Sequence, residues 1–164
     1  KELETDAPVE KKPTIKEPVT FLVPDTTMNV MPSTVGDILM PLTDGGIQQL
    51  FAGARANVGV KSGRYMFEAK IVEITNVQKQ LLPILKVGFT TAGSSLMVGE
   101  TADGICFDSE GHFVSQKVKT KSHAKIARHS VVAVVLNLDA ASPNVNTVSL
   151  FVNGMRVSQP QALP

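Results

Sequence analysis

Hydrophobic and polar side chains alternate along several short stretches of this chain. In the clearest of them, residues 63–72, Tyr65 and Phe67 fall on one face, whereas Arg64 and Glu68 fall on the other. A period of two residues is typical of a β-strand that has one face on a core and the other in water. The pattern therefore predicts a half-buried strand in this stretch.

Further apolar stretches of strand length follow, at residues 85–89, 104–107, 131–138 and 148–152. The stretch 131–138 is apolar on both faces, which suits a strand between two layers. Asn153-Gly154 then predicts a tight hairpin turn, because both residue types tolerate the positive φ that a type I′ turn requires. No stretch of about 12 residues or more has a convincing helical period. The chain is therefore predicted to be all-β, an antiparallel sandwich or barrel.

The composition changes near residue 19. Residues 1–18 contain nine charged residues and three prolines without a sustained period, which predicts a solvated, disordered linker. Residues 19–164 are predicted to form one domain, since the whole chain of 164 residues is 43% hydrophobic and 19% charged. Because the sequence begins with Lys1 rather than Met, we interpret it as part of a larger, multidomain protein.

The covalent and targeting signals favour an intracellular protein, nuclear or cytoplasmic. Cys106 is the single cysteine, so the chain has no internal disulfide, and it has no N-glycosylation sequon. The longest apolar run, residues 131–136, is much shorter than the roughly 18 residues of a membrane-spanning helix, so no membrane insertion is expected. The net charge of +1 indicates no class of partner by itself.

Four blocks of the sequence resemble one known family. They are the stretch 53–70 with its Arg-Ala step, Ser-Gly turn and Phe-Glu strand, then Lys86-Val-Gly-Phe, then Gly104-Ile-Cys-Phe-Asp, and finally residues 134–139 followed by 147–154. In this order they resemble the SPRY domain, and the resemblance covers about residues 19–164. Residues 66–113 are most similar to the type found in heterogeneous nuclear ribonucleoprotein U.

The resemblance implies a bent sandwich of two sheets that acts as a non-catalytic protein-interaction module. Two departures stand out. Phe89 occupies a position where the family usually has tryptophan, which leaves the local packing open. The family also continues past the Asn-Gly hairpin into one last apolar strand, whereas this sequence stops at Pro164, so we expect the last strand to be missing.

In SPRY domains, partner peptides dock on variable loops at one end of the sandwich. The corresponding loops here are residues 43–49, 90–97 and 139–146, and loops on a rigid scaffold commonly carry binding residues. Leu96 and Met97 could either anchor a partner or cover the core. We therefore expect a protein or peptide partner, and the candidate contact residues are Asp44, Gln48, Gln49, Ser94, Leu96, Met97 and Asn144.

A basic stretch offers an alternative function. Between residues 117 and 129 there are several cations and no acid; the cations are Lys117, Lys119, Lys121, Lys125 and Arg128. We favour a solvated edge strand whose lysines prevent sheet-to-sheet pairing. The alternative is an RNA-binding patch or a patch for an acidic peptide. No aromatic residue interleaves with these charges, so a platform for stacking single-stranded bases is not indicated.

Candidates for catalysis and metal binding are weak. Cys106 and His112 could form a nucleophile–base pair, but Cys106 lies in a predicted strand, where a thiol is usually a buried, inert side chain. His123 and His129 have a zinc-like spacing without further ligands, and we interpret them as solvated loop residues. We expect no enzyme activity, no metal, no cofactor and no small-molecule substrate.

Overall fold

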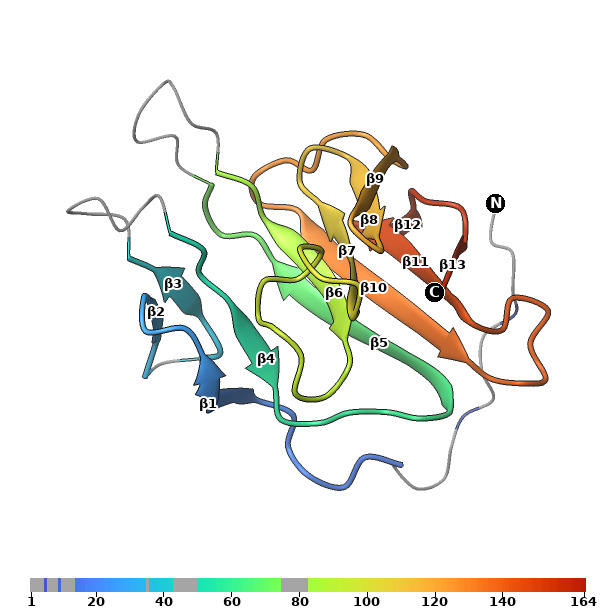
Figure 1. Ribbon diagram of the computed structural model, residues 1–164, viewed down its shortest axis with the longest axis horizontal. Helices are drawn as coiled ribbons and strands as arrows, with labels where there is room; N and C mark the ends of the chain where they lie inside the picture. Colours follow the sequence, from blue (N-terminus) through green and yellow to red (C-terminus); the bar gives the residue numbers. More distant parts are fainter. Residues whose placement is uncertain (1–4, 6–8, 10–13, 35, 43–49, 75–82) are drawn as a thin grey trace.

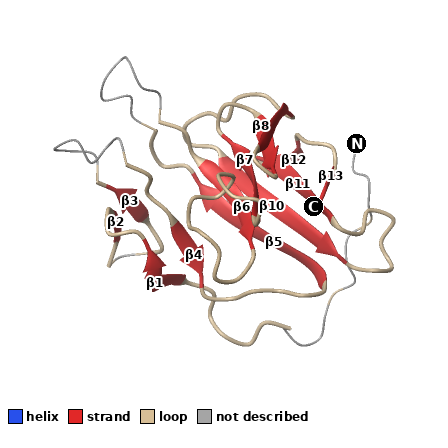
Figure 2. Ribbon diagram, in the orientation of Figure 1, coloured by secondary structure: helices blue, strands red, loops and turns tan. Residues whose placement is uncertain are grey.

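The computed structural model describes residues 5, 9, 14–34, 36–42, 50–74 and 83–164. These residues form strands, turns and loops but no helix, and every strand pair is antiparallel (Figures 1 and 2). Consequently no helix in the described part could cross a membrane. The strands are β1 (Phe21–Thr26), β2 (Val30–Pro32), β3 (Leu39–Pro41), β4 (Ala54–Ala56), β5 (Gly63–Lys70), β6 (Lys86–Thr90), β7 (Gly104–Asp108), β8 (His112–Ser115), β9 (Val118–Lys121), β10 (Val131–Leu138), β11 (Thr147–Val152), β12 (Met155–Arg156) and β13 (Gln161–Ala162).

Two sheets form the body of the protein. The large sheet has the order β12-β11-β10-β5, with β13 also paired to β11, and the four-stranded sheet has the order β6-β7-β8-β9. The two sheets pack face to face, and the ribbons β1–β4 and β2–β3 lie to one side of them (Figure 1). This is a β-sandwich, as the alternating pattern predicts.

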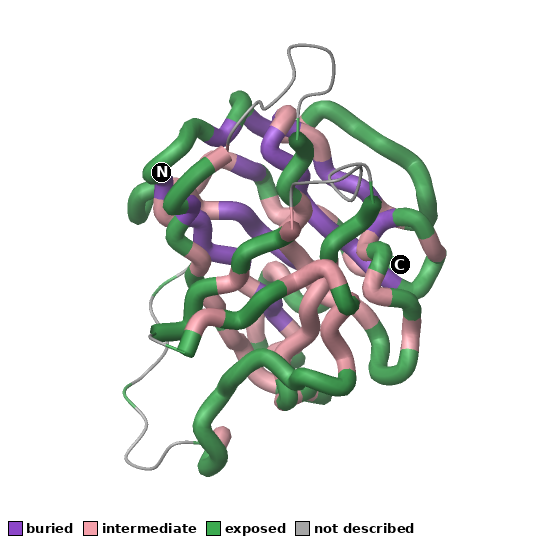
Figure 3. The backbone as a smooth tube through the Cα atoms, turned by 90° about the vertical axis from the view of Figure 1, so that its left-hand side faces the viewer, coloured by how far each residue is buried: buried purple, intermediate pink, exposed green. Residues whose placement is uncertain are grey.

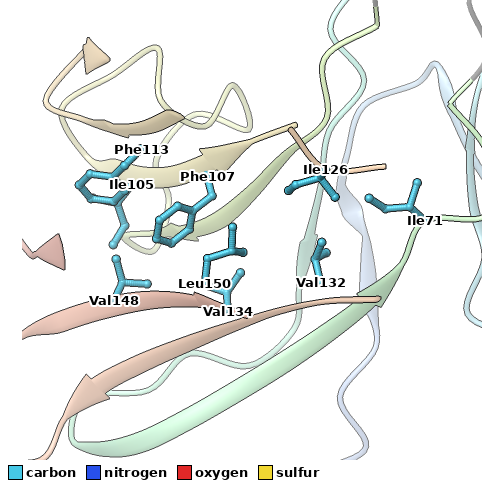
Figure 4. Close-up of a cluster of buried hydrophobic side chains, with 9 residues drawn as sticks. All are labelled: Ile71, Ile105, Phe107, Phe113, Ile126, Val132, Val134, Val148 and Leu150. Carbon is cyan, nitrogen blue, oxygen red and sulfur yellow. The ribbon is translucent and has the colours of Figure 1, made fainter. Parts of the chain in front are cut away.

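The hydrophobic core lies between the two sheets (Figure 4). Alternate residues of β10 and β11, among them Val134 and Leu150, point toward Phe107 of the four-stranded sheet. Phe107 and Leu150 are completely buried. The buried stretches, purple in Figure 3, accordingly gather inside the molecule under exposed loops. The cluster consists of Ile71, Ile105, Phe107, Phe113, Ile126, Val132, Val134, Val148 and Leu150.

The long strands lie where the hydrophobic alternation predicts them. In β5, Phe67 pairs with Val134 of β10 and packs against the core, while Glu68 points to the exposed side. The turn between β11 and β12 has positive φ at Asn153 and Gly154, 51° and 79°, as a type I′ hairpin requires. The predicted turn is therefore confirmed.

Phe89 joins the two sheets at the position where the family usually has tryptophan. Its ring lies 5.3 Å from the ring of Phe67, centroid to centroid, with an interplanar angle of 72°. Such an edge-to-face contact is a favoured aromatic geometry. The smaller ring is thus accommodated by an aromatic partner from the opposite sheet.

The end of the chain pairs with the outer edge of β11. The sequence led us to expect no strand after the hairpin, but Gln161–Ala162 form the two-residue strand β13, which pairs with β11 at Val148 and Thr147. Between β12 and β13 the buried Ser158 accepts a hydrogen bond from Leu150 N through its Oγ, at 2.8 Å. Two short pieces and one serine therefore cover this edge in place of a continuous strand.

Some elements were not predicted. The strands β1, β2 and β3 each contain a proline and largely exposed side chains, so they lack an alternating pattern. The predicted linker, residues 1–18, lies mostly outside the described residues.

Gly88 provides a test of the pairing between β6 and β7. A Cβ at this position would collide with the carbonyl oxygen of Ile105 and with the backbone of Cys106, neither of which can move alone. We expect Gly88→Ala to lower the free energy of unfolding by about 2 kcal/mol because the two strands must separate. Gly59→Ala is the control, since a Cβ there meets open space. Urea denaturation measures the free energy of unfolding of both variants. A value for Gly88→Ala equal to that of the wild type would contradict this register.

Candidate functional site

Arg55 of β4 holds the loop that follows β6. One guanidinium nitrogen forms an ion pair with Asp25 at 2.8 Å, and the other donates to the carbonyl oxygens of Ser94 and Ser95 at 2.6 and 3.2 Å. Within the loop, Ser94 N and Oγ both donate to Thr91 O. A guanidinium can make several such bonds in one plane, so Arg55 fixes the loop as a unit.

The two apolar residues of this loop have different environments. Leu96 is half-buried and lies against Gly53, where a Cβ would meet the carbonyl oxygen of Leu96 at 2.9 Å. Met97 is 46% exposed, and its backbone N donates to Ser95 Oγ. Leu96 thus packs on Gly53, the residue before β4, whereas Met97 is displayed to solvent on an anchored backbone.

Of the remaining loop candidates, Asn144 lies among the described residues. Asp44, Gln48 and Gln49 lie outside the described residues. Asn144 is half-buried in the loop that connects β10 and β11, where its carbonyl oxygen accepts from Thr147 Oγ1 at 2.6 Å. In Figure 1 that loop lies beyond the ends of β10 and β11, away from the loop after β6.

The basic stretch begins at the β8–β9 turn and continues beyond β9, the edge strand of the four-stranded sheet. Lys117 occupies the turn with a φ of 65°. Lys119 forms an ion pair with Asp108 at 2.8 Å, and Lys125 forms one with Glu110 at 2.6 Å.

Two of the remaining three cations of the stretch, Lys121 and Arg128, form hydrogen bonds. Lys121 Nζ donates to a backbone carbonyl oxygen of the preceding turn, that of residue 110, at 3.0 Å. Arg128 Nε donates to His129 Nε2 at 2.8 Å. The stretch is therefore much less positive in the folded protein than its sequence suggests, because acids from other segments lie against two of its lysines.

Asp108 lies at the centre of the polar contacts on the outer face of the four-stranded sheet. Its side chain is completely buried. Burial would raise the pKa of this carboxyl group, but the ammonium group of Lys119 and hydrogen bonds from His112 N and Nδ1 outweigh burial and hold the pKa at about 2. The group is thus a structural anion that links β7, β8 and β9.

Cys106 and His112 do not form a catalytic pair. The Cys106 side chain is 1% exposed in β7, and its Sγ contacts Val98 O at 3.8 Å. Burial raises the pKa of the thiol to about 11, so it stays protonated at neutral pH. His112 bonds to Asp108 instead, at 3.1 Å. The best nucleophile candidate of the sequence is therefore an inert core thiol.

The structure corrects the interpretation of His123 as a solvated loop residue. His123 is buried rather than solvated; its Nε2 donates to Asp108 O at 3.1 Å, and its ring lies edge-on to Phe107. Burial lowers its pKa, so the ring is neutral at pH 7. His129 is exposed. Among the described residues no group of three or more His, Cys, Asp or Glu side chains could hold a metal ion.

A groove with a volume of about 420 Å³ lies on the outer face of the four-stranded sheet. Val114 of β8 and Gly99 of the loop after β6 form its floor. Gly99 approaches so closely that a Cβ would touch Cys106 Sγ and Val114. Lysines and a glutamate line the groove together with Phe51 and Ile84.

Comparison with known proteins identifies the fold. The structure is similar to the SPRY domain of human HERC1, with a TM-score of 0.63 and 18% sequence identity over 86% of this chain and 78% of that chain. No protein-family model and no curated protein sequence matches the chain. The chain therefore has the SPRY β-sandwich fold.

Asp108 gives the stability of the domain a defined pH dependence. Because the folded pKa of about 2 lies below the ordinary 3.8, ionised Asp108 stabilises the protein above about pH 4, and this contribution of about 2 kcal/mol disappears as the pH falls through 2. We expect the difference in unfolding free energy between the wild type and Asp108→Asn to shrink by this amount between pH 6 and pH 2. Urea titrations measure it.

The exposed Asp103 supplies the control for this experiment. Asp103→Asn should keep the pH dependence of the wild type. An Asp108→Asn variant with the same dependence as the wild type would show that the carboxylate is not paired as described.

The environment of Cys106 predicts slow thiol chemistry. A disulfide reagent such as dithionitrobenzoate should react at the rate of unfolding in the native protein and within seconds in denaturant, because only the exposed thiolate is reactive. The absorbance of the released thiolate measures the rate. Rapid stoichiometric reaction of the native protein would revive the catalytic interpretation.

Proposed function

We propose that this chain is a non-catalytic protein-interaction module, part of a larger multidomain protein, that recognises a partner protein through the loop after β6. The SPRY fold supports this role in general. The observation that carries the proposal is the contact of Arg55 with the carbonyl oxygens of Ser94 and Ser95. A loop fixed in this way can present Met97 to a partner with little further loss of conformational entropy on binding.

Two finer points belong to the same proposal. The similarity to the heterogeneous nuclear ribonucleoprotein U type stays a prediction from residues 66–113. An intracellular location, nuclear or cytoplasmic, is supported by a single cysteine that is buried in β7. A small-molecule substrate or cofactor is not part of the proposed function.

An RNA-binding function is the alternative for the basic stretch. Two of its five cations are paired with carboxylates, Lys119 with Asp108 and Lys125 with Glu110. Phosphate contacts by these two lysines would have to compete with the existing pairs. The described geometry therefore favours protein recognition over RNA recognition, and salt dependence distinguishes them.

The test is affinity capture from a cell extract at about 50 mM and about 500 mM salt, since phosphate binding weakens steeply over this range. We expect the wild type to retain a partner protein at high salt. Met97→Asp should weaken the binding of this partner about tenfold or more, because it places a charge in the contact. Met155→Asp is the control, because Met155 of β12 is also an exposed methionine, at 70% against 46% for Met97.

The outcome for nucleic acid decides the alternative. A double variant with Lys117→Glu and Lys121→Glu leaves the buried pair of Asp108 with Lys119 intact. Nucleic acid recovered only at low salt and lost in this variant would replace the proposed function. A partner equally sensitive to Met97→Asp and Met155→Asp would place the contact elsewhere.

A further inference from the structure

The groove on the four-stranded sheet combines an apolar side with a cationic side. Phe51 and Ile84 line it near β6, and Lys117 and Lys119 line it at the β8–β9 hairpin. Because β6 and β9 are the two edges of this sheet, the two sides are three strand spacings apart, about 14 Å. A single extended chain that runs along the groove, between the two sides, can therefore direct its alternate side chains to one side and to the other.

The apolar side consists of large side chains held in exposed positions. Phe51 is 56% exposed and Ile84 is 50% exposed. The carbonyl oxygen of Phe51 accepts from Asn29 Nδ2 at 2.9 Å, which fixes the backbone beneath the ring. The ammonium group of Lys86 lies 5.8 Å from the centre of that ring. A fixed, half-exposed aromatic ring beside a cation is a common anchor in peptide recognition.

The cations that line the groove are only partly neutralised. Lys119 is held by the buried Asp108, and Lys86, which belongs to β6 on the apolar side, is paired with Glu100. Lys117 forms no ion pair with any described residue. Glu100 is half-exposed, and the hydrogen bond from Lys86 lowers its pKa. The Lys86 side chain is 19% exposed, whereas the Glu100 side of the pair is open to water, so a ligand can displace Glu100 from the solvent side.

We propose that this groove binds an extended peptide segment of a partner protein in which acidic and apolar residues alternate. Alternate side chains of an extended peptide point to opposite sides. The apolar ones then pack on Phe51 and Ile84, and the acidic ones reach Lys117 and, in place of Glu100, Lys86. Glu100 acts as an internal competitor that occupies the cation until the peptide carboxylate replaces it.

A peptide suits the groove better than a nucleic acid. Polynucleotides bind along continuous positive surfaces, because each nucleotide carries a phosphate. Here the carboxylate of Glu100 lines the groove beside Lys86 and interrupts the positive surface. The volume of about 420 Å³ is within the range of ligand clefts, about 300–1,000 Å³. Acidic side chains separated by apolar ones match both the charge and the shape.

Met97 does not line the groove, so this inference can fail while the proposed function holds, and the reverse. The experiment selects binders from a displayed library of random peptides about eight residues long, which gives about four side chains for each side of the groove. Selected peptides are then synthesised with a fluorescent label, and their affinity is measured by fluorescence anisotropy. We expect enrichment of acidic residues next to apolar ones.

The variants assign the binding to this groove. Lys117→Glu and Phe51→Ala should each weaken a selected peptide about tenfold, whereas Glu100→Gln should tighten it about threefold because Lys86 becomes available. Met97→Asp should leave the affinity unchanged. Replacing the acids of the peptide by their amides should abolish binding.

Other results would overturn the proposal. They are a selection without acidic enrichment, an affinity unaffected by Lys117→Glu and Phe51→Ala, or weaker binding to Glu100→Gln. Displacement of the peptide by single-stranded oligouridylate at physiological salt would assign the groove to nucleic acid instead. Loss of binding in Met97→Asp alone would return the recognition to the loop and leave the groove without this role.

Discussion

The buried carboxylate of Asp108 is the constraint on which the outer face of the four-stranded sheet depends. A carboxylate without access to water must be neutralised and hydrogen-bonded, or it would take up a proton. His112 of β8 and Lys119 of β9 meet this requirement from the next two strands of the sheet. This requirement fixes the position of Lys119, and the position of Lys119 in turn sets the charge distribution along one side of the groove. A structural need of the fold thus determines which lysines remain available to a ligand.

Sequence patterns predicted the parts of the structure that depend on local periodicity. The alternation of Tyr65 and Phe67 with polar residues identified β5, and Asn153-Gly154 identified the hairpin turn. The strands β1 to β3 have no such periodicity, because their side chains are mostly exposed and their partners are distant or equally short. Their formation depends on pairing, which a single stretch of sequence does not reveal.

The candidate site was less predictable for a related reason. Arg55 was visible in the sequence as part of an Arg-Ala step, but its contact with Ser94 joins segments 39 residues apart. The basic stretch looked free of acids, since Asp108 and Glu110 precede it along the chain and meet its lysines only after the β7–β8 and β8–β9 hairpins have formed. Charges counted along the sequence therefore misjudge a surface that is assembled from several strands.

The edge of β11 is completed by β12, Ser158 and β13, all of which follow it in the sequence. During translation the outer hydrogen-bonding groups of β11 therefore stay unpaired until about nine more residues have been added after Val152. At 5–20 residues per second this delay is on the order of one second. For that interval the nascent chain offers a chaperone, or a neighbouring nascent chain, a strand edge that the finished domain conceals.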